Sequence, residues 1–94
     1  MTNDTNKIVK IAKALSDKNR IEMLKEIAAK GTITCSEVEK KTLLSQPTVS
    51  HHIKILLDAD LIVGEKQGKY LLMSLNKTLL KEFSPLAFAM ITGE

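Results

Sequence analysis

One segment constrains the fold of this chain most, because a capped amphipathic helix runs directly into two predicted strands. Ser45 is suited to cap that helix, and Pro47 stands in its first turn, where a missing N–H costs no hydrogen bond. From Leu61 the apolar residues change from helical to extended spacing. We therefore predict a helix over about 46–59 and a β-hairpin, or wing, over about 61–75.

The hairpin is predicted to have strands over 61–63 and 70–75, joined through residues 66–69. Gly68 can supply the positive φ that a tight hairpin turn needs. A single hairpin is not stable alone in water, so this one is expected to pack beside the helix over 46–59.

Helical spacing of apolar residues predicts three helices before this segment and one after it. The first helix is indicated by an apolar stripe of Ile8, Ile11, Ala12 and Leu15. The second is bounded by Ser16 and Asp17 before it and by Gly31 after it. A capping box of Ser36 and Glu39 begins the third, and Asn76 caps the last. β-Branched residues over 32–34 suit a short extended stretch. Pro85 predicts a kink in the last helix or a restart capped by Ser84.

This order of elements predicts a mainly α fold with one β-hairpin. The sequence α-α-α-α-β-β-α, with Leu43 and Leu44 in the turn before the fourth helix, is typical of a winged helix-turn-helix. We predict one such domain over 1–94. A chain this short is only marginally able to bury a self-sufficient core, which favours a homodimer.

Composition sets broad limits on function. The formal net charge of +3 and the pI near 9.1 are compatible with a nucleic-acid partner. The single Cys35 excludes an intramolecular disulfide. No signal peptide or membrane span is found, so a cytoplasmic protein without a membrane partner is expected. No glycine-rich phosphate loop and no oriented nucleophile and base are found, so an enzyme is not expected.

The helix over about 46–59 gathers compact polar side chains opposite its apolar face. A recognition helix needs this arrangement, because its N-terminal side chains reach base edges while its positive dipole end faces phosphate. Lysines of the hairpin turn are placed to reach an adjacent backbone or minor groove. The predicted DNA-binding residues are Ser45, Gln46, Pro47, Thr48, Ser50, His51 and Lys54 of the helix, with Lys66 and Lys69 of the hairpin.

Two other interpretations of this face stay open. Polar residues on an exposed helix face are often only solvated, and a winged-helix module can bind a protein instead of DNA. Ile55, predicted to be exposed, and the modest net charge would suit a protein partner. Salt dependence separates these cases, because phosphate contacts release counterions and an apolar interface does not.

The two adjacent histidines are predicted to have different roles, because neighbouring residues of a helix do not face each other. His51 faces outward and is assigned to DNA. His52 lies at the edge of the apolar face and is predicted to be a hydrogen-bonded structural residue. Arg20 is expected either to contact phosphate or to tie the second helix to its neighbours.

The chain resembles the arsenic-resistance-repressor (ArsR) family of small dimeric bacterial regulators. The resemblance lies in segments 14–27 and 43–76 and in the spacing between them, and its most specific part is Ser-Gln-Pro-x-x-Ser-x-His from Ser45. It implies a winged helix-turn-helix homodimer that binds double-stranded DNA at a two-fold symmetric operator. It also implies repression when no inducer is bound, the inducer being of unknown class.

In that family the first and last helices form the dimer interface. Carried onto this sequence, the resemblance implies an interface of Ile8, Ile11, Leu15, Leu79, Phe83, Leu86 and Met90. The alternative is that these residues only close the core of one chain.

The chain departs from the family's metal sensors at both of their ligand sites. The Cys-x-Cys positions fall on Thr34 and Ser36, and a lone Cys35 between two hydroxyls cannot complete a soft metal site within one chain. The predicted last helix, 77–92, has no histidine and only Glu82 as an acidic residue. No metal or cofactor is therefore expected. A thiol at a helix start can have a lowered pKa, which suits oxidant sensing, and the alternative is that Cys35 is incidental.

Overall fold

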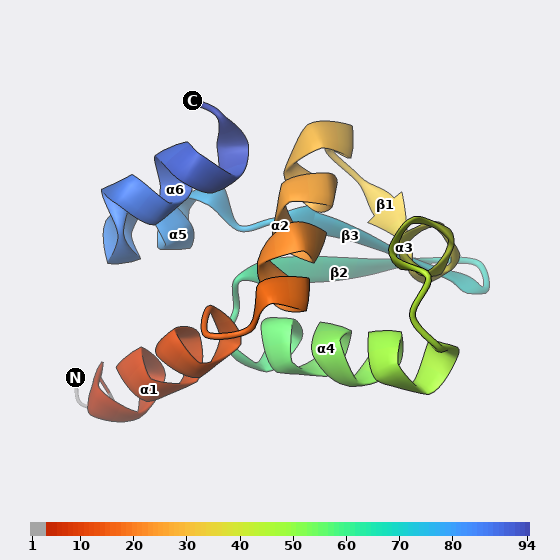
Figure 1. Ribbon diagram of the computed structural model, residues 1–94, viewed down its shortest axis with the longest axis horizontal. Helices are drawn as coiled ribbons and strands as arrows, with labels where there is room; N and C mark the ends of the chain where they lie inside the picture. The colour runs from red at the N-terminus through yellow and green to blue at the C-terminus, as the bar shows by residue number, and fades with distance from the viewer. Residues whose placement is uncertain (1–3) are drawn as a thin grey trace.

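The computed structural model describes residues 4–94, so the first three residues of the predicted domain 1–94 lie outside the described residues. The elements in this part of the chain are α1 (Asp4–Ala14), α2 (Lys18–Lys30), β1 (Ile33–Thr34), α3 (Cys35–Thr42), α4 (Gln46–Asp58), β2 (Ile62–Gln67), β3 (Tyr70–Leu75), α5 (Lys77–Phe83) and α6 (Pro85–Thr92), as Figure 1 shows. The predicted mainly α fold, with its helix-turn-helix followed by a hairpin, is confirmed.

The three strands form one antiparallel sheet in the order β1-β3-β2. The hairpin of β2 and β3 turns at Gly68, whose φ of 62° is the positive value expected there. Strand β1 is the predicted short extended stretch, and Ile33 lies opposite Met73 of β3. The sheet therefore has one strand more than the predicted hairpin.

Strand β2 extends to Gln67, whereas the sequence predicts its end at Val63. After Ile62 every residue of β2 is exposed, so the segment lacks the apolar alternation that reveals a half-buried strand. Pairing with β3 as far as Gln67 opposite Tyr70 holds the segment extended.

The capping box at the start of α3 is formed by Thr34 and Glu37, so the prediction of Ser36 and Glu39 is wrong. The Thr34 hydroxyl accepts a hydrogen bond from the Glu37 N–H at 3.3 Å, and the Thr34 N–H donates to the Glu37 carboxylate at 2.8 Å. Both pairs have the required spacing in the sequence. Pairing of Thr34 with β3 decides between them, because it holds Thr34 in the extended conformation of an N-cap.

Pro85 divides the C-terminal helical segment, and the predicted restart at Ser84 is confirmed. Helix α5 ends at Phe83, and the Ser84 hydroxyl accepts a hydrogen bond from the Ala87 N–H at 3.0 Å. Pro85 then stands at the first position of α6, where its fixed φ suits a helix start.

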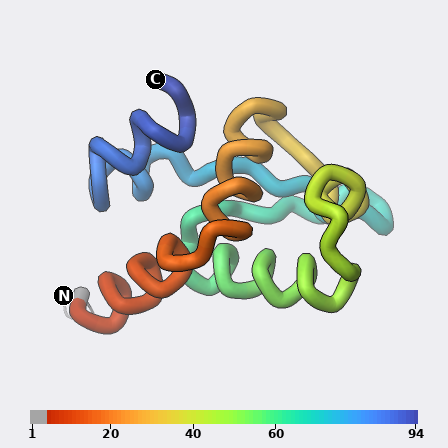
Figure 2. Tube along the Cα trace, in the orientation of Figure 1, coloured from red at the N-terminus to blue at the C-terminus, as the bar shows by residue number. Residues whose placement is uncertain are grey.

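The core lies where α2 and α4 pack against the sheet and against each other. Its largest fully buried side chains include Met23, Leu24, Ile27, Ile33, Leu56, Leu61, Ile62, Met73 and Leu80. Helices α1, α5 and α6 lie at one end of the long axis, and the α3–α4 turn and the hairpin tip lie at the other (Figures 1 and 2). No helix within residues 4–94 has both the length and the apolar character needed to cross a membrane.

Candidate nucleic-acid interface

Helix α4 begins at a well-formed cap of small polar side chains. The Ser45 hydroxyl accepts a hydrogen bond from the Thr48 N–H at 3.4 Å and lies 2.9 Å from the Thr48 hydroxyl. Pro47 stands in the first turn, where the helix needs no N–H from it. All three residues are exposed. The positive end of the helix dipole therefore meets solvent at a surface suited to an anion such as phosphate.

The exposed face of α4 carries every residue of this helix that the sequence assigns to DNA. Exposed are Gln46, Pro47, Thr48, Ser50, His51 and Lys54, and buried are Val49, His52, Ile53 and Leu56. The amide of Gln46, the hydroxyl of Ser50 and the imidazole of His51 can each form hydrogen bonds with base edges. These groups lie in the N-terminal half of the helix, which is the part that enters the major groove in helix-turn-helix proteins.

The hairpin places two further lysines at the same end of the molecule. Lys66 is the penultimate residue of β2 and Lys69 belongs to the turn, and both are exposed. Figure 1 shows the hairpin tip and the N-terminus of α4 at one end of the long axis. The hairpin lysines and the α4 surface can therefore approach one extended polyanion.

Lys54 continues the exposed face one turn beyond Ser50. Its Nζ lies 3.6 Å from a carboxylate oxygen of Asp58, and both side chains are largely exposed. An exposed pair of this spacing contributes only about 0.3–0.5 kcal/mol to stability. A phosphate can therefore replace Asp58 as the partner of Lys54 at little cost.

The opposite side of α4 is held by a buried hydrogen bond between His52 and Arg20 of α2. Arg20 Nη1 lies 3.0 Å from His52 Nδ1, and each residue is 7% exposed. A guanidinium can only donate, so Nδ1 accepts and the ring proton lies on Nε2. The prediction that His52 is a hydrogen-bonded structural residue is confirmed.

Arg20 also reaches the C-terminal end of α1. Its Nε donates to the Ala14 carbonyl at 2.9 Å, and its Nη2 donates to the Lys13 carbonyl at 3.0 Å. Of the two predicted roles of Arg20, the tie between helices is the one observed. One buried cation thus joins α1, α2 and α4.

The charge state of His52 matters for this tie. Burial lowers the pKa of His52, the Asp17 carboxylate raises it, and the nearby Arg20 and His51 lower it. Protonation would remove the acceptor of the Arg20 hydrogen bond and place two cations in contact. Neutral His52 is therefore the form that holds α4 in this position.

Cys35 opens α3 with its side chain half-buried. Burial raises the pKa of the Cys35 thiol, the Glu39 carboxylate raises it further, and a hydrogen bond with Ser50 opposes the change. The hypothesis of a thiol activated by the helix start is therefore wrong, because less of it is thiolate than in a free cysteine. Across residues 4–94, no three cysteine, histidine or acidic side chains gather as a metal site requires.

Apolar side chains are exposed on α1 and α6, at the end of the molecule away from the hairpin tip (Figure 1). Ile8 and Val9 of α1 are 53% and 58% exposed, and Leu86 and Met90 of α6 are 71% and 69% exposed. Leu86 and Met90 are four residues apart, so they share one face of α6. We call these four residues the apolar end. Exposed apolar side chains on two helices at one end of a molecule suit a protein–protein contact.

The other residues of the predicted interface are less accessible. Leu15, Leu79 and Phe83 are half-buried and pack against the core. Ile11 is 2% exposed, so its side chain belongs to the core of the chain itself and not to a free surface. Helical periodicity does not predict Val9 as an interface residue, because Val9 lies off the stripe that Ile8 and Ile11 define.

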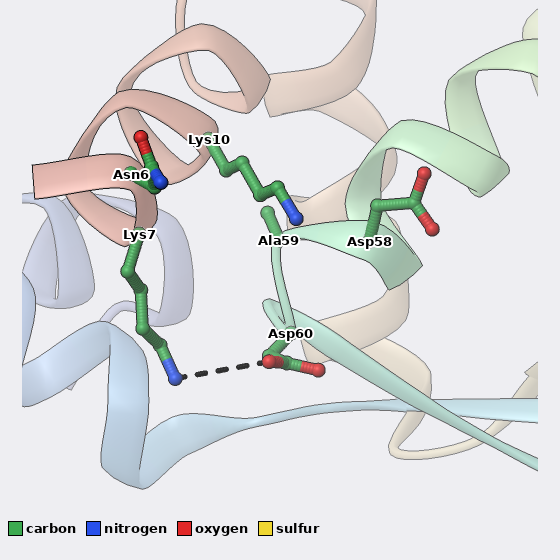
Figure 3. Close-up of a pocket in the computed structure, with 6 residues that line it drawn as sticks. All are labelled: Asn6, Lys7, Lys10, Asp58, Ala59 and Asp60. Carbon is green, nitrogen blue, oxygen red and sulfur yellow. Dashed lines mark ion pairs between the residues drawn. The ribbon is translucent and has the colours of Figure 1, made fainter. Parts of the chain in front are cut away.

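A shallow polar pocket lies between α1 and the turn after α4 (Figure 3). It is lined by Asn6, Lys7, Lys10, Asp58, Ala59 and Asp60. Lys7 Nζ lies 3.7 Å from the Asp60 carboxylate, and the two lysines face two aspartates across the pocket. The charges balance, so the pocket ties α1 to the end of α4 and does not attract ions of one sign.

Two residues near the interface differ from what their sequence context predicts. Ile55 is half-buried and packs against the core, so its predicted exposure is wrong and one argument for a protein partner is lost. Leu43, in the turn before α4, is 92% exposed and has a φ of 61°. Sequence patterns give no signal for Leu43, because leucine is an unusual residue at a left-handed position.

Comparison with known proteins agrees with this geometry. A family model described as a helix-turn-helix domain matches residues 15–65, more than half of the chain. The transcriptional repressor SdpR of Bacillus subtilis (strain 168) is 32% identical over 72 residues, which are 77% of this chain and 79% of that protein. The arsenical resistance operon repressor of Staphylococcus aureus is 35% identical over 72 residues, which are 77% of this chain and 68% of that protein.

A solved homodimeric winged helix-turn-helix DNA-binding domain from Mycobacterium bovis shares the fold. Its TM-score is 0.76 at 16% identity, with 96% of this chain and 86% of that chain covered. The matched helix-turn-helix region contains both α3 and α4, and the two repressors match most of the chain described above. The chain therefore belongs to the ArsR family of winged helix-turn-helix transcriptional regulators.

Proposed function

We propose that this protein is a sequence-specific DNA-binding repressor that acts as a homodimer on a two-fold symmetric operator. The observation that carries the proposal is the exposed polar face in the N-terminal half of α4, at the same end of the molecule as the hairpin lysines. Both relatives named above are transcriptional repressors, which supports the same function.

In the proposed complex, the N-terminal half of α4 enters the major groove. Gln46, Ser50 and His51 form hydrogen bonds with base edges, and the capped N-terminus of α4 faces a phosphate. Lys54 contacts the backbone beside the same groove. Lys66 and Lys69 reach the next stretch of backbone from the hairpin, and these contacts position the protein without reading the bases.

The proposed dimer contact uses the apolar end, made of Ile8, Val9, Leu86 and Met90. This surface lies at the end of the long axis opposite the α3–α4 turn, so a partner bound there leaves α4 free. Leu15, Leu79 and Phe83, which are half-buried, would lie directly beneath the contact and support it. The homodimeric Mycobacterium bovis domain, which has the same fold, supports this arrangement. Two-fold symmetry of the protein then requires two-fold symmetry of the operator.

Selection of bound duplexes from a random DNA library, at near-physiological salt, tests the proposal. The purified protein should enrich one motif with two-fold symmetry, and binding to it should weaken by about 0.9 log units per log unit of salt for each phosphate contact. Failure of a folded, dimeric sample to enrich any motif would contradict the proposal and favour a winged-helix module that binds a protein.

A further inference from the structure

Helix α4 is bounded by the two non-glycine residues of segment 4–94 that have a positive φ. Leu43 precedes the helix and Asp60 follows it, and each has a φ of 61°. Side chains rarely adopt this left-handed conformation, whereas glycine adopts it without steric cost. Each of the two residues therefore has a side chain at a position where glycine would be less strained.

The two side chains differ in what they do for the chain itself. The Asp60 carboxylate lies 3.7 Å from Lys7 Nζ, as Figure 3 shows, so its side chain has a partner in α1. The Leu43 side chain is 92% exposed and therefore packs against almost nothing in its own chain. An exposed leucine gains almost no stabilisation from burial, so its side chain does not offset the cost of the strained backbone.

The backbone at Leu43 has a structural purpose that does not require leucine. The Leu43 N–H donates to the Glu39 carbonyl at 3.3 Å and closes the last turn of α3, which is the usual role of a left-handed residue after a helix. Glycine would make the same turn. The leucine side chain is therefore explained by a contact outside the chain.

The surroundings of Leu43 indicate the kind of partner. Lys40 and Lys41 in the last turn of α3 are exposed, and Ser45, the cap of α4, follows two residues after Leu43. Ammonium groups and a helix N-terminus match phosphates, whereas an apolar protein surface would have to strip water from both. The apolar end, where a second copy would bind, lies at the opposite end of the long axis.

We propose that Leu43 is a further DNA contact, which packs against an apolar group of the duplex beside the phosphates that face the N-terminus of α4. The group is a thymine methyl or a deoxyribose, because these are the apolar surfaces that DNA presents there. This inference rests on the proposed DNA-binding function and adds the turn of the helix-turn-helix to the interface.

The test uses the duplex enriched from the random library and measures dissociation constants over a range of salt concentrations. Leu43→Gly and Leu43→Asn should each weaken binding about tenfold, as expected for losing roughly half of the burial of a leucine. Leu43→Met should bind within about twofold of the parent, because it keeps an apolar side chain. The salt dependence should not change, because an apolar contact releases no counterions.

Asp60→Gly is the matched control, since it removes a side chain at the same φ from the other end of α4. It should keep the affinity of the parent, and circular dichroism should show every variant folded. Substituting uracil for each thymine of the duplex removes one methyl group at a time. Weaker binding of the parent at one position would assign the contact to that methyl, and unchanged binding throughout would assign it to a deoxyribose.

Three results would overturn the contact alone: Leu43→Gly binding as tightly as the parent, Asp60→Gly losing as much affinity, or Leu43→Gly lowering the salt dependence. In each of these cases the parent still binds its enriched duplex, so the proposed function would stand. A parent protein that enriches no duplex would overturn both proposals together.

Discussion

Helices α4 and α6, which lie at opposite ends of the molecule, expose different kinds of side chain. At one end α4 presents Gln46, Ser50 and His51, which are polar groups of modest size. At the other end α6 presents Leu86 and Met90, each about 70% exposed. The side chains of both helices are exposed, and their chemistry differs. A hydrated polyanion suits the first surface and a second protein surface suits the other.

The two ends are also joined by specific contacts. Arg20 holds the last carbonyl groups of α1 and the His52 ring of α4. Lys7 of α1 pairs with Asp60 in the turn after α4. Helix α1, which carries part of the apolar end, is therefore also in direct contact with α4 through Arg20 and with the turn after it.

The largest effect is expected from a charge placed in the apolar end. Leu86→Glu should raise the dimer dissociation constant about 100-fold, because an unpaired carboxylate buried in the contact costs about 3 kcal/mol. Sedimentation equilibrium measures this change. Thr32→Glu, which adds the same charge to an exposed loop between α2 and β1, should leave the dimer intact. If the Leu86→Glu protein remained dimeric, the apolar end would not be the dimer contact.

Substitutions of the two adjacent histidines should have different effects on the stability of the protein, because only His52 is buried. His52→Ala leaves a buried Arg20 donor without its acceptor, so it should lower the free energy of unfolding by about 2 kcal/mol. His51→Ala should change that free energy by less than about 0.5 kcal/mol, because His51 is exposed. Urea unfolding measures both variants.

Specificity is expected to depend on His51, which lies on the exposed face of α4. His51→Ala should reduce the preference for the enriched duplex over a scrambled one by about 1–3 kcal/mol, the usual worth of a base contact. Equal losses on the two duplexes would show that His51 touches only the backbone.

A decrease in pH should loosen the tie between α2 and α4. Because folding lowers the pKa of His52, the unfolded chain binds a proton that the folded chain disfavours. The contribution of neutral His52 to stability is therefore complete above the ordinary histidine pKa of 6.5 and is lost as the pH falls below it. Unfolding curves at pH 7.5 and at lower pH should show this loss. His52→Asn keeps an acceptor that does not titrate, so its curves should depend less on pH over the same window.

The smallest effect is expected at the hairpin. Lys69→Ala should weaken binding to the enriched and the scrambled duplex alike and lower the salt slope by about 0.9, as for one lost phosphate contact. Lys81→Ala, on α5 at the other end, provides the control with the same loss of charge. Equal slopes for Lys69→Ala and the parent would mean that the hairpin does not reach DNA.

Much of the fold and of the exposed polar face of α4 could be predicted because the signals are local. The cap at Ser45, the restart at Ser84 and the turn at Gly68 depend on residues a few positions apart. The polar and apolar faces of α4 follow from helical periodicity alone. The most specific part of the resemblance to the ArsR family begins at the cap of the same helix.

Contacts between distant residues decided the rest. Thr34 caps α3 in place of Ser36 because β3 holds Thr34 extended, and pairing with β3 lengthens β2 where its own residues carry no pattern. The partner of His52 is Arg20, which lies 32 positions away in the chain. Ile8 and Ile11 share one stripe in the sequence, yet only packing makes Ile8 exposed and Ile11 buried.

The amino-acid sequence alone therefore determined the order of the elements, the face of α4 that is polar and the family. Tertiary structure decided which of two equivalent caps is used, which apolar residues are free for a partner, and that Leu43 is a strained, exposed leucine beside the recognition helix. The physical reason is the distance along the chain over which each interaction acts. Capping and periodicity act within one or two turns, whereas burial and strand pairing depend on segments that only the folded chain brings together.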